Sequence, residues 1–313
     1  MKLLKLVPDK TNIQFINKRL IAFALSAFLI LGSLGLFFGQ GLNLGIDFLG
    51  GILIEAKTKG PANLGELRSE LGGLDLGEVS LQEFGAPDDV LIRIQKQEGG
   101  DNAQQVAIEK VKATLGDRVI EYRRTEFVGP TVGAELREAA TWAVLSAIFA
   151  ILMYIWFRFE WQFGVGAVIA LVHDVITTIG LFALLQLEFN LATVAAILTI
   201  AGYSINDTVV VYDRVRENMR RYKKMAYEEL FNISINQTLS RTVVTSVTTL
   251  LALLSLFFFG GEVIRGFSIA LIWGVLIGTY SSIALAVPFL LYIRPQRGGE
   301  EETDELPDSA SSA

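Results

Sequence analysis

Six long apolar stretches alternate with polar segments along the chain, and this pattern predicts six membrane-spanning helices. Each stretch is close to the ~20 residues that cross a bilayer core of ~30 Å. Hydrophobic residues make up 51% of the chain and its mean hydropathy is +0.45, which is too apolar for an ordinary soluble domain. We therefore predict a polytopic α-helical membrane protein. Its spans are residues 20–38, 139–157, 163–187, 191–212, 242–259 and 267–293.

Residues 40–138, between the first two spans, have a different pattern of apolar and polar residues. Alternating apolar and polar positions predict four strands, and two stretches have apolar residues at helical spacing. The resulting order, βαββαβ, is typical of an α+β ferredoxin-like domain. Its carboxylates are scattered and it lacks histidine, which favours a binding or docking module. The expected elements are strands 51–57, 78–84, 90–96 and 118–128, helices 62–71 and 103–115, and a turn at 86–89.

Basic residues fall on one side of the predicted helices, which sets their orientation. Residues 1–19 carry five Lys or Arg, and the predicted loop 213–241 is also strongly basic. The short loops on the opposite side offer only Arg265. By the positive-inside rule, we expect both termini to lie in the cytoplasm and residues 40–138 to lie outside it. The acidic, Ser-rich tail 294–313 is expected to be disordered and cytoplasmic.

Composition excludes several functions. The chain has no cysteine and one histidine, His173, so neither a disulfide, nor a thiol nucleophile, nor a Cys-ligated or His-rich metal site is possible. The net charge is −6, and no basic tract is long enough to indicate nucleic-acid binding. No motif supports covalent catalysis. We expect neither an enzyme nor a bound cofactor or metal.

Asp207, beside Asn206, lies within the fourth predicted span. A carboxylate at that depth costs about 2.5–3.5 kcal/mol on insertion scales. We predict that Asp207 takes part in a proton relay and that Arg241, at the start of the fifth span, is its counter-ion. Alternatively, Asp207 lies at the lipid headgroups because the helix emerges early, and Arg241 is a simple cytoplasmic anchor.

Further polar residues accompany these two. Asp174 is predicted to belong to the relay, and the adjacent His173 is a further candidate to relay protons, although it equally suits a hydrogen bond to a neighbouring helix. Thr245 and Thr248 share a face of the fifth span with Arg241. Such hydroxyls either support a polar pathway, as Asn206 is expected to do, or bond back to their own helix.

Small residues recur every fourth position in the sixth span. Gly266, Gly274 and Gly278 belong to this stripe, and such spacing lets a second helix backbone approach closely. We interpret these glycines as helix-packing residues.

Several longer motifs resemble the SecF family, whose members are membrane subunits of the bacterial protein-export machinery. The resemblance covers nearly the whole chain, although Leu49 stands where the family often has Thr. The motifs are GIDFLGG at Gly45, FVGPTVGAEL at Phe127, RFEW at Arg158, HDV at His173, IAGYSINDTVVVYDRVREN at Ile200, TLSRTVVTSVTTL at Thr238 and GTYSSIALA at Gly278.

The resemblance implies a half of an RND-type transporter that pairs with SecD, works beside the SecYEG channel and uses the proton-motive force to move unfolded polypeptide across the membrane. It also implies roles in proton movement for Asp207 and Arg241. Two other functions stay open. The first is proton-coupled efflux of small molecules or lipids by the same superfamily, and the second is a membrane scaffold without ion flux.

Overall fold

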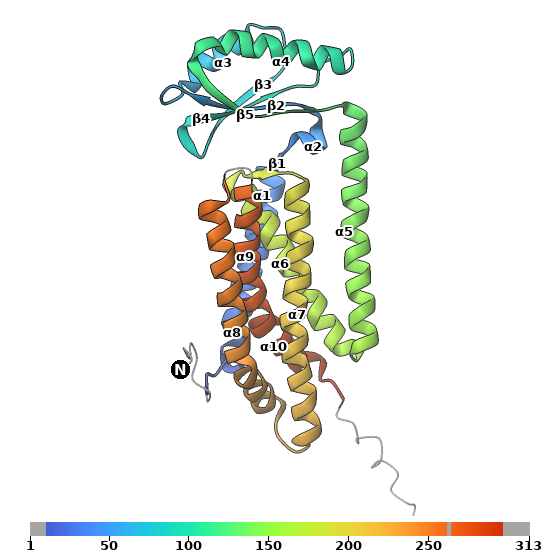
Figure 1. Cartoon of the computed structure of the whole chain (residues 1–313). Helices are drawn as coiled ribbons and strands as arrows, with labels where there is room; N and C mark the ends of the chain where they lie inside the picture. Colours follow the sequence, from blue (N-terminus) through green and yellow to red (C-terminus); the bar gives the residue numbers. More distant parts are fainter. Residues whose placement is uncertain (1–10, 262–263, 297–313) are drawn as a thin grey trace, which may run out of the picture.

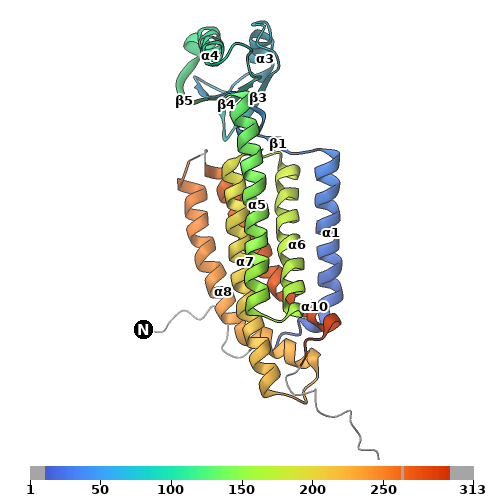
Figure 2. The same cartoon turned by 90° about the vertical axis from the view of Figure 1, so that its right-hand side faces the viewer.

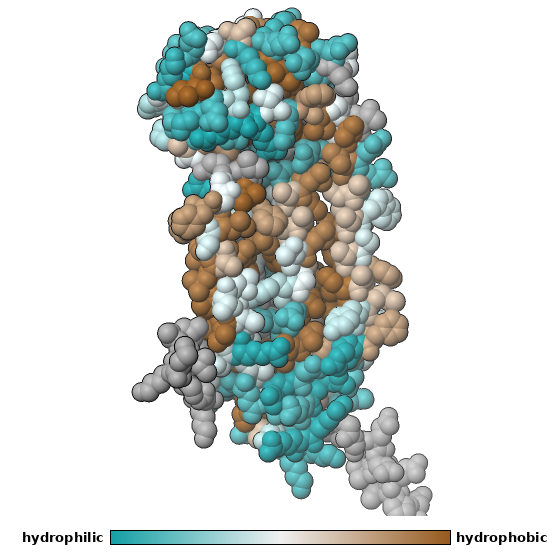
Figure 3. Space-filling model, in the orientation of Figure 1, coloured by the Kyte–Doolittle hydropathy of each residue, from teal (hydrophilic) through white to brown (hydrophobic). Residues whose placement is uncertain are grey.

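The computed structural model describes residues 11–261 and 264–296, so the first ten residues and most of the acidic tail lie outside the described residues. An α/β module sits at one end of a bundle of long helices (Figure 1). On the face seen in the space-filling view, mainly hydrophobic residues cover the middle of the bundle, between the hydrophilic module and a hydrophilic opposite end (Figure 3). Six helical stretches are long and apolar enough to cross a membrane. The chain is therefore a multi-pass helical membrane protein.

The membrane-spanning helices are α1, α5, α6, α7, α8 and a last span divided into α9 and α10. Three of them, α6, α7 and α9, form the buried centre, whereas α1, α5 and α8 lie at the periphery with most of their surface exposed. α5 runs beside the others as a separate column and leads from the module to the opposite end (Figures 1 and 2). Their bounds are α1 Arg19–Gly39, α5 Pro130–Arg158, α6 Trp161–Leu185, α7 Leu191–Arg221, α8 Tyr227–Phe259, α9 Arg265–Ser281 and α10 Val287–Ile293, after a short 3-10 turn at Ile16–Lys18.

The module contains a four-stranded sheet with the strand order β3-β4-β2-β5, all neighbours antiparallel. Two helices cover one face of the sheet. The core between these helices and the sheet includes Ile54, Ile92 and Val111. The opposite face turns towards the bundle (Figure 1). The elements are β2 Gly51–Thr58, α3 Leu64–Gly72, β3 Val79–Phe84, β4 Ala86–Ile94, α4 Asp101–Leu115, a 3-10 turn at Gly116–Arg118 and β5 Val119–Val128.

A second, two-stranded sheet joins the module to the bundle. β1, Asn43–Leu44, pairs in parallel with β6, Glu188–Phe189, which connects α6 to α7. The short helix α2, Ile46–Leu49, follows β1, and Gly50 and Gly51 then adopt φ values of 72° and 114°. Side chains disfavour such values, which explains the two glycines at the entry to β2. The segment from Gly45 to Gly51 thus contains a helical turn of its own.

The segment 213–241 was expected to be a basic loop, and this prediction was wrong. α7 continues to Arg221 and α8 begins at Tyr227, which leaves five residues between them. Opposite charges at helical spacing explain the continuation, since Arg214 pairs with Glu217 three residues later. Asn218 also donates hydrogen bonds to Ser234 and Gln237 across the hairpin.

Two other boundaries differ from the sequence-based prediction. The turn before β4 lies at Gly85, with φ 87°, and Ala86 to Asp89 belong to the strand. Asp88 and Asp89 tolerate a strand position because Lys57 and Arg123 pair with them. The last span is also not one regular helix, because a π-helical segment, Ser282–Ala286, precedes Pro288 in α10.

Candidate functional site

The most completely buried polar cluster in the bundle centres on Asp174 of α6. Its Oδ2 accepts hydrogen bonds from Ser204 Oγ of α7 at 2.5 Å and from Ser281 Oγ of α9 at 2.8 Å. All three side chains are buried, and they come from the three central helices. A buried carboxylate is tolerable where donors surround it in this way. The cluster therefore fixes α6, α7 and α9 relative to one another.

His173 extends this cluster towards α1. Its Nδ1 lies 2.9 Å from Asp174 Oδ1, and its ring lies 5.9 Å from that of Tyr280 on α9. The Tyr280 hydroxyl donates to the carbonyl of Ala22 and contacts Ser26 Oγ, both on α1. Among the described residues, His173 Nε2 is buried without a hydrogen-bond partner. The pair thus combines a satisfied carboxylate with an imidazole nitrogen that still has bonding capacity.

Asp207 lies one turn beyond Ser204 on α7 and is 4% exposed. Its side chain therefore faces the interior of the bundle. Its Oδ2 has no hydrogen-bond partner among the described residues. A buried carboxylate oxygen without a partner is costly, so a partner, a water molecule or a proton must compensate it when the protein works.

Arg241 is the charged group whose electrostatic attraction reaches Asp207. No ion pair joins the two side chains within the part of the chain that the structure describes, and Arg241 is exposed on the outer face of α8. The predicted pairing of Arg241 with Asp207 is therefore not formed in this structure. A small relative movement of α7 and α8 would change this interaction.

The other predicted polar residues lie differently. Thr245 and Thr248 donate to carbonyls of their own helix, Arg241 O and Val244 O, and both are exposed. Asn206 is also exposed, on the face of α7 next to that of Asp207. These residues give the outside of the bundle a polar strip instead of lining its interior.

The glycine stripe of α9 divides into two parts. An added Cβ at Gly274 would lie 2.2 Å from Ile200 of α7, and one at Gly278 would lie 3.2 Å from Ser204 Cβ. Both glycines therefore permit close contact between α7 and α9. Gly266 has no described atom within 4 Å of such a Cβ, so it does not share this packing role.

Sequence reasoning missed the hydroxyl partners of the site. Ser204, Ser281 and the pair Thr208–Ser282, whose hydroxyls lie 2.8 Å apart, are all buried between α7 and the last span. The signal was present: Ser204 lies three residues before Asp207, on nearly the same helix face, and Ser281 and Ser282 lie in the GTYSSIALA motif.

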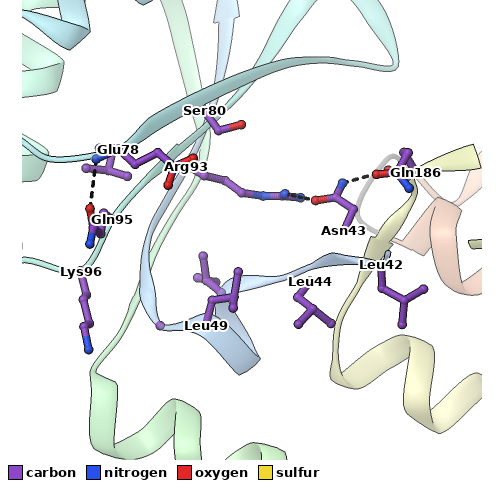
Figure 4. Close-up of a pocket in the computed structure, with 13 residues that line it drawn as sticks. Leu42, Asn43, Leu44, Leu49, Glu78, Ser80, Arg93, Gln95, Lys96 and Gln186 are labelled. Atoms are coloured by element: carbon purple, nitrogen blue, oxygen red, sulfur yellow. Dashed lines mark hydrogen bonds between the residues drawn. The ribbon is translucent and has the colours of Figure 1, made fainter. Parts of the chain in front are cut away.

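A polar junction connects the module to the end of the bundle that faces it. Arg93 of β4 donates to Asn43 Oδ1 at 2.5 Å and to Glu188 Oε2 at 3.0 Å, and Asn43 in turn donates to the Gln186 carbonyl (Figure 4). Asp47 of α2 accepts a hydrogen bond from the Leu191 amide at the start of α7. The helix that carries Asp207 is thus tied at its first residue to the segment that enters the module.

These features define a class. The chain is a membrane protein of six spans with buried carboxylates at its centre and a soluble module held at one end. Over the described residues, no group of acidic or histidine side chains is arranged to hold a metal ion.

Comparison with known proteins gives the family. Residues 107–296 match the C-terminal region of the protein export membrane proteins SecD/SecF, and residues 35–62 match the SecD/SecF GG motif. The protein translocase subunit SecF of Rhodobacter capsulatus is 47% identical, over 96% of this chain and 94% of its own length. That of Rickettsia bellii is 48% identical, over 92% of this chain and 95% of its own length. The chain belongs to the SecD/SecF family and is a SecF-type member, which supports a role in protein translocation.

Two solved structures are similar. SecDF from Thermus thermophilus, a translocon-associated membrane protein, is 37% identical with a TM-score of 0.84, over 92% of this chain. A super-membrane-facing form of SecDF is 38% identical with a TM-score of 0.66, over 91% of this chain. This chain spans 39% of the length of either protein.

Proposed function

We propose that the chain works with SecD as a subunit that uses the proton-motive force to drive or complete protein export across the bacterial inner membrane, beside the SecYEG channel. The observation that carries this proposal is Asp207. Its carboxylate is buried in a central membrane helix, and one of its oxygens has no partner among the described residues. Within a protein-export family, such a group is suited to taking up and releasing a proton.

The relay consists of Asp207, Arg241 and Asp174. When Asp207 is ionised, attraction to Arg241 holds α7 and α8 together, and protonation removes this attraction. Asp174 accepts a hydrogen bond from Ser204, which lies one turn before Asp207 on α7. A shift of α7 therefore strains the hydrogen bond between Ser204 and Asp174. The structural role of Asp174 and its role in the relay are therefore linked.

The partner SecD covers the polar strip outside the bundle. Asn206 and Arg241 are exposed on α7 and α8, where lipid tails would leave their polar groups without compensation. The SecDF structures are more than twice as long as this chain, which leaves room for a second half with the same architecture. A matching helix pair on SecD would complete the proton pathway.

The α/β module is the moving part. We take the module to be a ferredoxin-like domain in the periplasm, and its βαββαβ order and strand order β3-β4-β2-β5 support this proposal. A movement of α7 reaches the module through Leu191 and Asp47. The two SecDF structures resemble this chain to different degrees at almost equal identity, which is consistent with a fold that adopts more than one shape.

The available energy suits this task. One charge that crosses 100 mV releases about 2.3 kcal/mol, and one pH unit adds about 1.4 kcal/mol. A few kcal/mol is sufficient to move the module between two positions. The module can therefore keep an emerging polypeptide from sliding back.

A pulse-chase of a signal-peptide-bearing precursor tests the proposal. Cells depleted of the protein are complemented with wild type, with Asp207→Asn, or with Asp213→Asn as a control that changes a half-exposed carboxylate on the same helix, paired with Arg158. We expect the precursor to accumulate only with Asp207→Asn. Normal export after depletion would contradict the proposal and favour proton-coupled efflux.

A further inference from the structure

The sheet of the module has two edge strands, β3 and β5, and they differ in their protection. β5 carries Glu121, Arg123, Arg124 and Glu126, and its pairing with β2 is interrupted by two irregularities. Charges and bulges are the usual means of blocking further strand pairing at an edge. β3 exposes Ser80, Gln82 and a single charged residue, Glu83, at which its regular register ends. The less protected edge is therefore β3.

The backbone of β3 is arranged to accept another strand. The Gln95 amide donates to the Glu78 carbonyl, and the two strands pair in a constant register from there. Along an antiparallel strand, residues whose backbone groups bond to the neighbouring strand alternate with residues whose backbone groups point away from it. The amides and carbonyls of Val79, Leu81 and Glu83 therefore point away from β4. Within the described part of the chain, these groups bond to no other backbone. Only Arg68 reaches the Leu81 carbonyl, at 3.5 Å.

Two cavities lie beside this edge, between the sheet and the top of the bundle. The Ser80 cavity, about 580 Å³, is lined by Glu78, Ser80, Lys96, Leu42 and Leu44 among others (Figure 4). The Gln82 cavity, about 290 Å³, is lined by Gln82, Phe84, Asn190, Arg265 and Phe267 among others. Successive bundle-facing side chains of β3 thus open into two separate cavities.

The Arg93–Glu188 pair lies between the cavities, since Arg93 lines the first and Glu188 lines the second. Both cavities mix apolar and polar walls. Each cavity is large enough for a single side chain of a ligand. Because their walls are mixed, the cavities do not select for either apolar or polar side chains. This combination suits a ligand whose backbone is constant and whose side chains vary.

We propose that β3 is the docking edge for an extended, unfolded segment of the exported polypeptide, which adds to the sheet as a fifth strand. Main-chain hydrogen bonds to Val79, Leu81 and Glu83 provide affinity that is independent of sequence. Alternate side chains of the segment enter the Ser80 and Gln82 cavities, because side chains point to opposite faces along a strand. The inference rests on the proposed function, since it names where the moving module holds its substrate.

Site-specific photo-crosslinking tests the docking edge in membranes that contain the complete export machinery. The photoreactive residue p-benzoylphenylalanine replaces Gln82 on β3 or, as a matched control, Thr125 on the exposed side of β5. A precursor is arrested during translocation by a stably folded domain at its C-terminus. We expect a crosslink between position 82 and the precursor, and none from position 125. In the same cells, Gln82→Lys should slow export several-fold, whereas Thr125→Lys should leave it unchanged.

Each outcome decides the matter. A crosslink from position 82 to the precursor supports the docking edge. A crosslink from position 82 only to SecD or another membrane subunit overturns it and assigns β3 to a subunit contact. Absence of any crosslink from position 82, in cells where depletion still slows export, overturns the docking edge and leaves the proposed function intact. Normal export after depletion overturns both.

Discussion

Ser204 of α7 donates a hydrogen bond of 2.5 Å to the carboxylate of Asp174 on α6, one turn away from the buried carboxylate of Asp207. Ser204 thus connects Asp174, whose two carboxylate oxygens both have partners, to the turn of α7 that carries Asp207. Asp174 can hold the helices in place, whereas Asp207 has an oxygen without a partner among the described residues. This difference between the two carboxylates underlies the account of how a proton moves α7.

Replacing Ser204 by Ala should destabilise the bundle. A hydrogen bond to a charged group contributes about 1.5–3 kcal/mol in soluble proteins, and membrane helices average nearer ~0.6 kcal/mol. We therefore expect a lower unfolding temperature for Ser204→Ala in detergent. Ser255→Ala is the control, because the Ser255 hydroxyl is exposed and bonds only to its own helix. An equal response of both variants would contradict the assignment of Asp174 as the fixed point of the bundle.

The close helix crossings predict which glycines tolerate a methyl group. An added Cβ at Gly180 of α6 would lie 2.7 Å from the backbone of Ser33 on α1, and one at Gly274 would meet Ile200. Overpacking of this kind costs about 1–3 kcal/mol. Gly180→Ala and Gly274→Ala should lower the unfolding temperature, and Gly266→Ala should not. Destabilisation by Gly266→Ala alone would show that the crossings are placed wrongly.

The glycine spacing illustrates what the sequence could and could not predict. A small residue every fourth position predicts a helix interface, but it does not say where along the helix the neighbour crosses. Gly274 and Gly278 lie at the crossing with α7, and Gly266 lies beyond it. The crossing point depends on tertiary packing, so it is visible only in the structure.

The same limit applies to the polar residues. Asp207 and Asp174 were identifiable because a carboxylate in an apolar helix is costly wherever it points. The threonines of α8 were not assignable, because a hydroxyl can bond to its own helix, as Thr245 does. The helical hairpin at 213–241 was missed because its charges suggested a loop, although their spacing also suits a helix, as in Arg214 and Glu217.

The Arg93–Glu188 pair should hold the module against the bundle. Both side chains are largely buried, and a buried pair that loses one partner leaves an uncompensated charge. In Arg93→Ala we expect a broader distribution of distances between spin labels on α3 and on β6. The chain has no cysteine, so labels can be placed without background. Arg118→Ala is the control, because it breaks a pair inside the module. An unchanged distribution in Arg93→Ala would mean that other contacts hold the module.

The Glu70–Arg118 pair gives the module a pH-dependent contribution to stability. The hydrogen bond from Arg118 lowers the pKa of Glu70 below its ordinary value of 4.5. A carboxyl with a lowered pKa stabilises the fold fully above that ordinary value and loses its contribution as the pH falls through the lowered pKa. The unfolding temperature of Glu70→Gln should therefore lie below that of wild type at pH 7, and the difference should vanish in strong acid. A difference that persists there would exclude an ionic origin.

Proton uptake by the reconstituted complex tests the central claim most directly. The protein and SecD are placed in liposomes with a trapped pH-sensitive dye, and a potassium gradient with valinomycin sets the membrane potential. The account predicts potential-driven acidification with wild type and with Asp213→Asn, and only background with Asp207→Asn. Equal acidification with Asp207→Asn and wild type would contradict the assignment of Asp207 as the proton-carrying group.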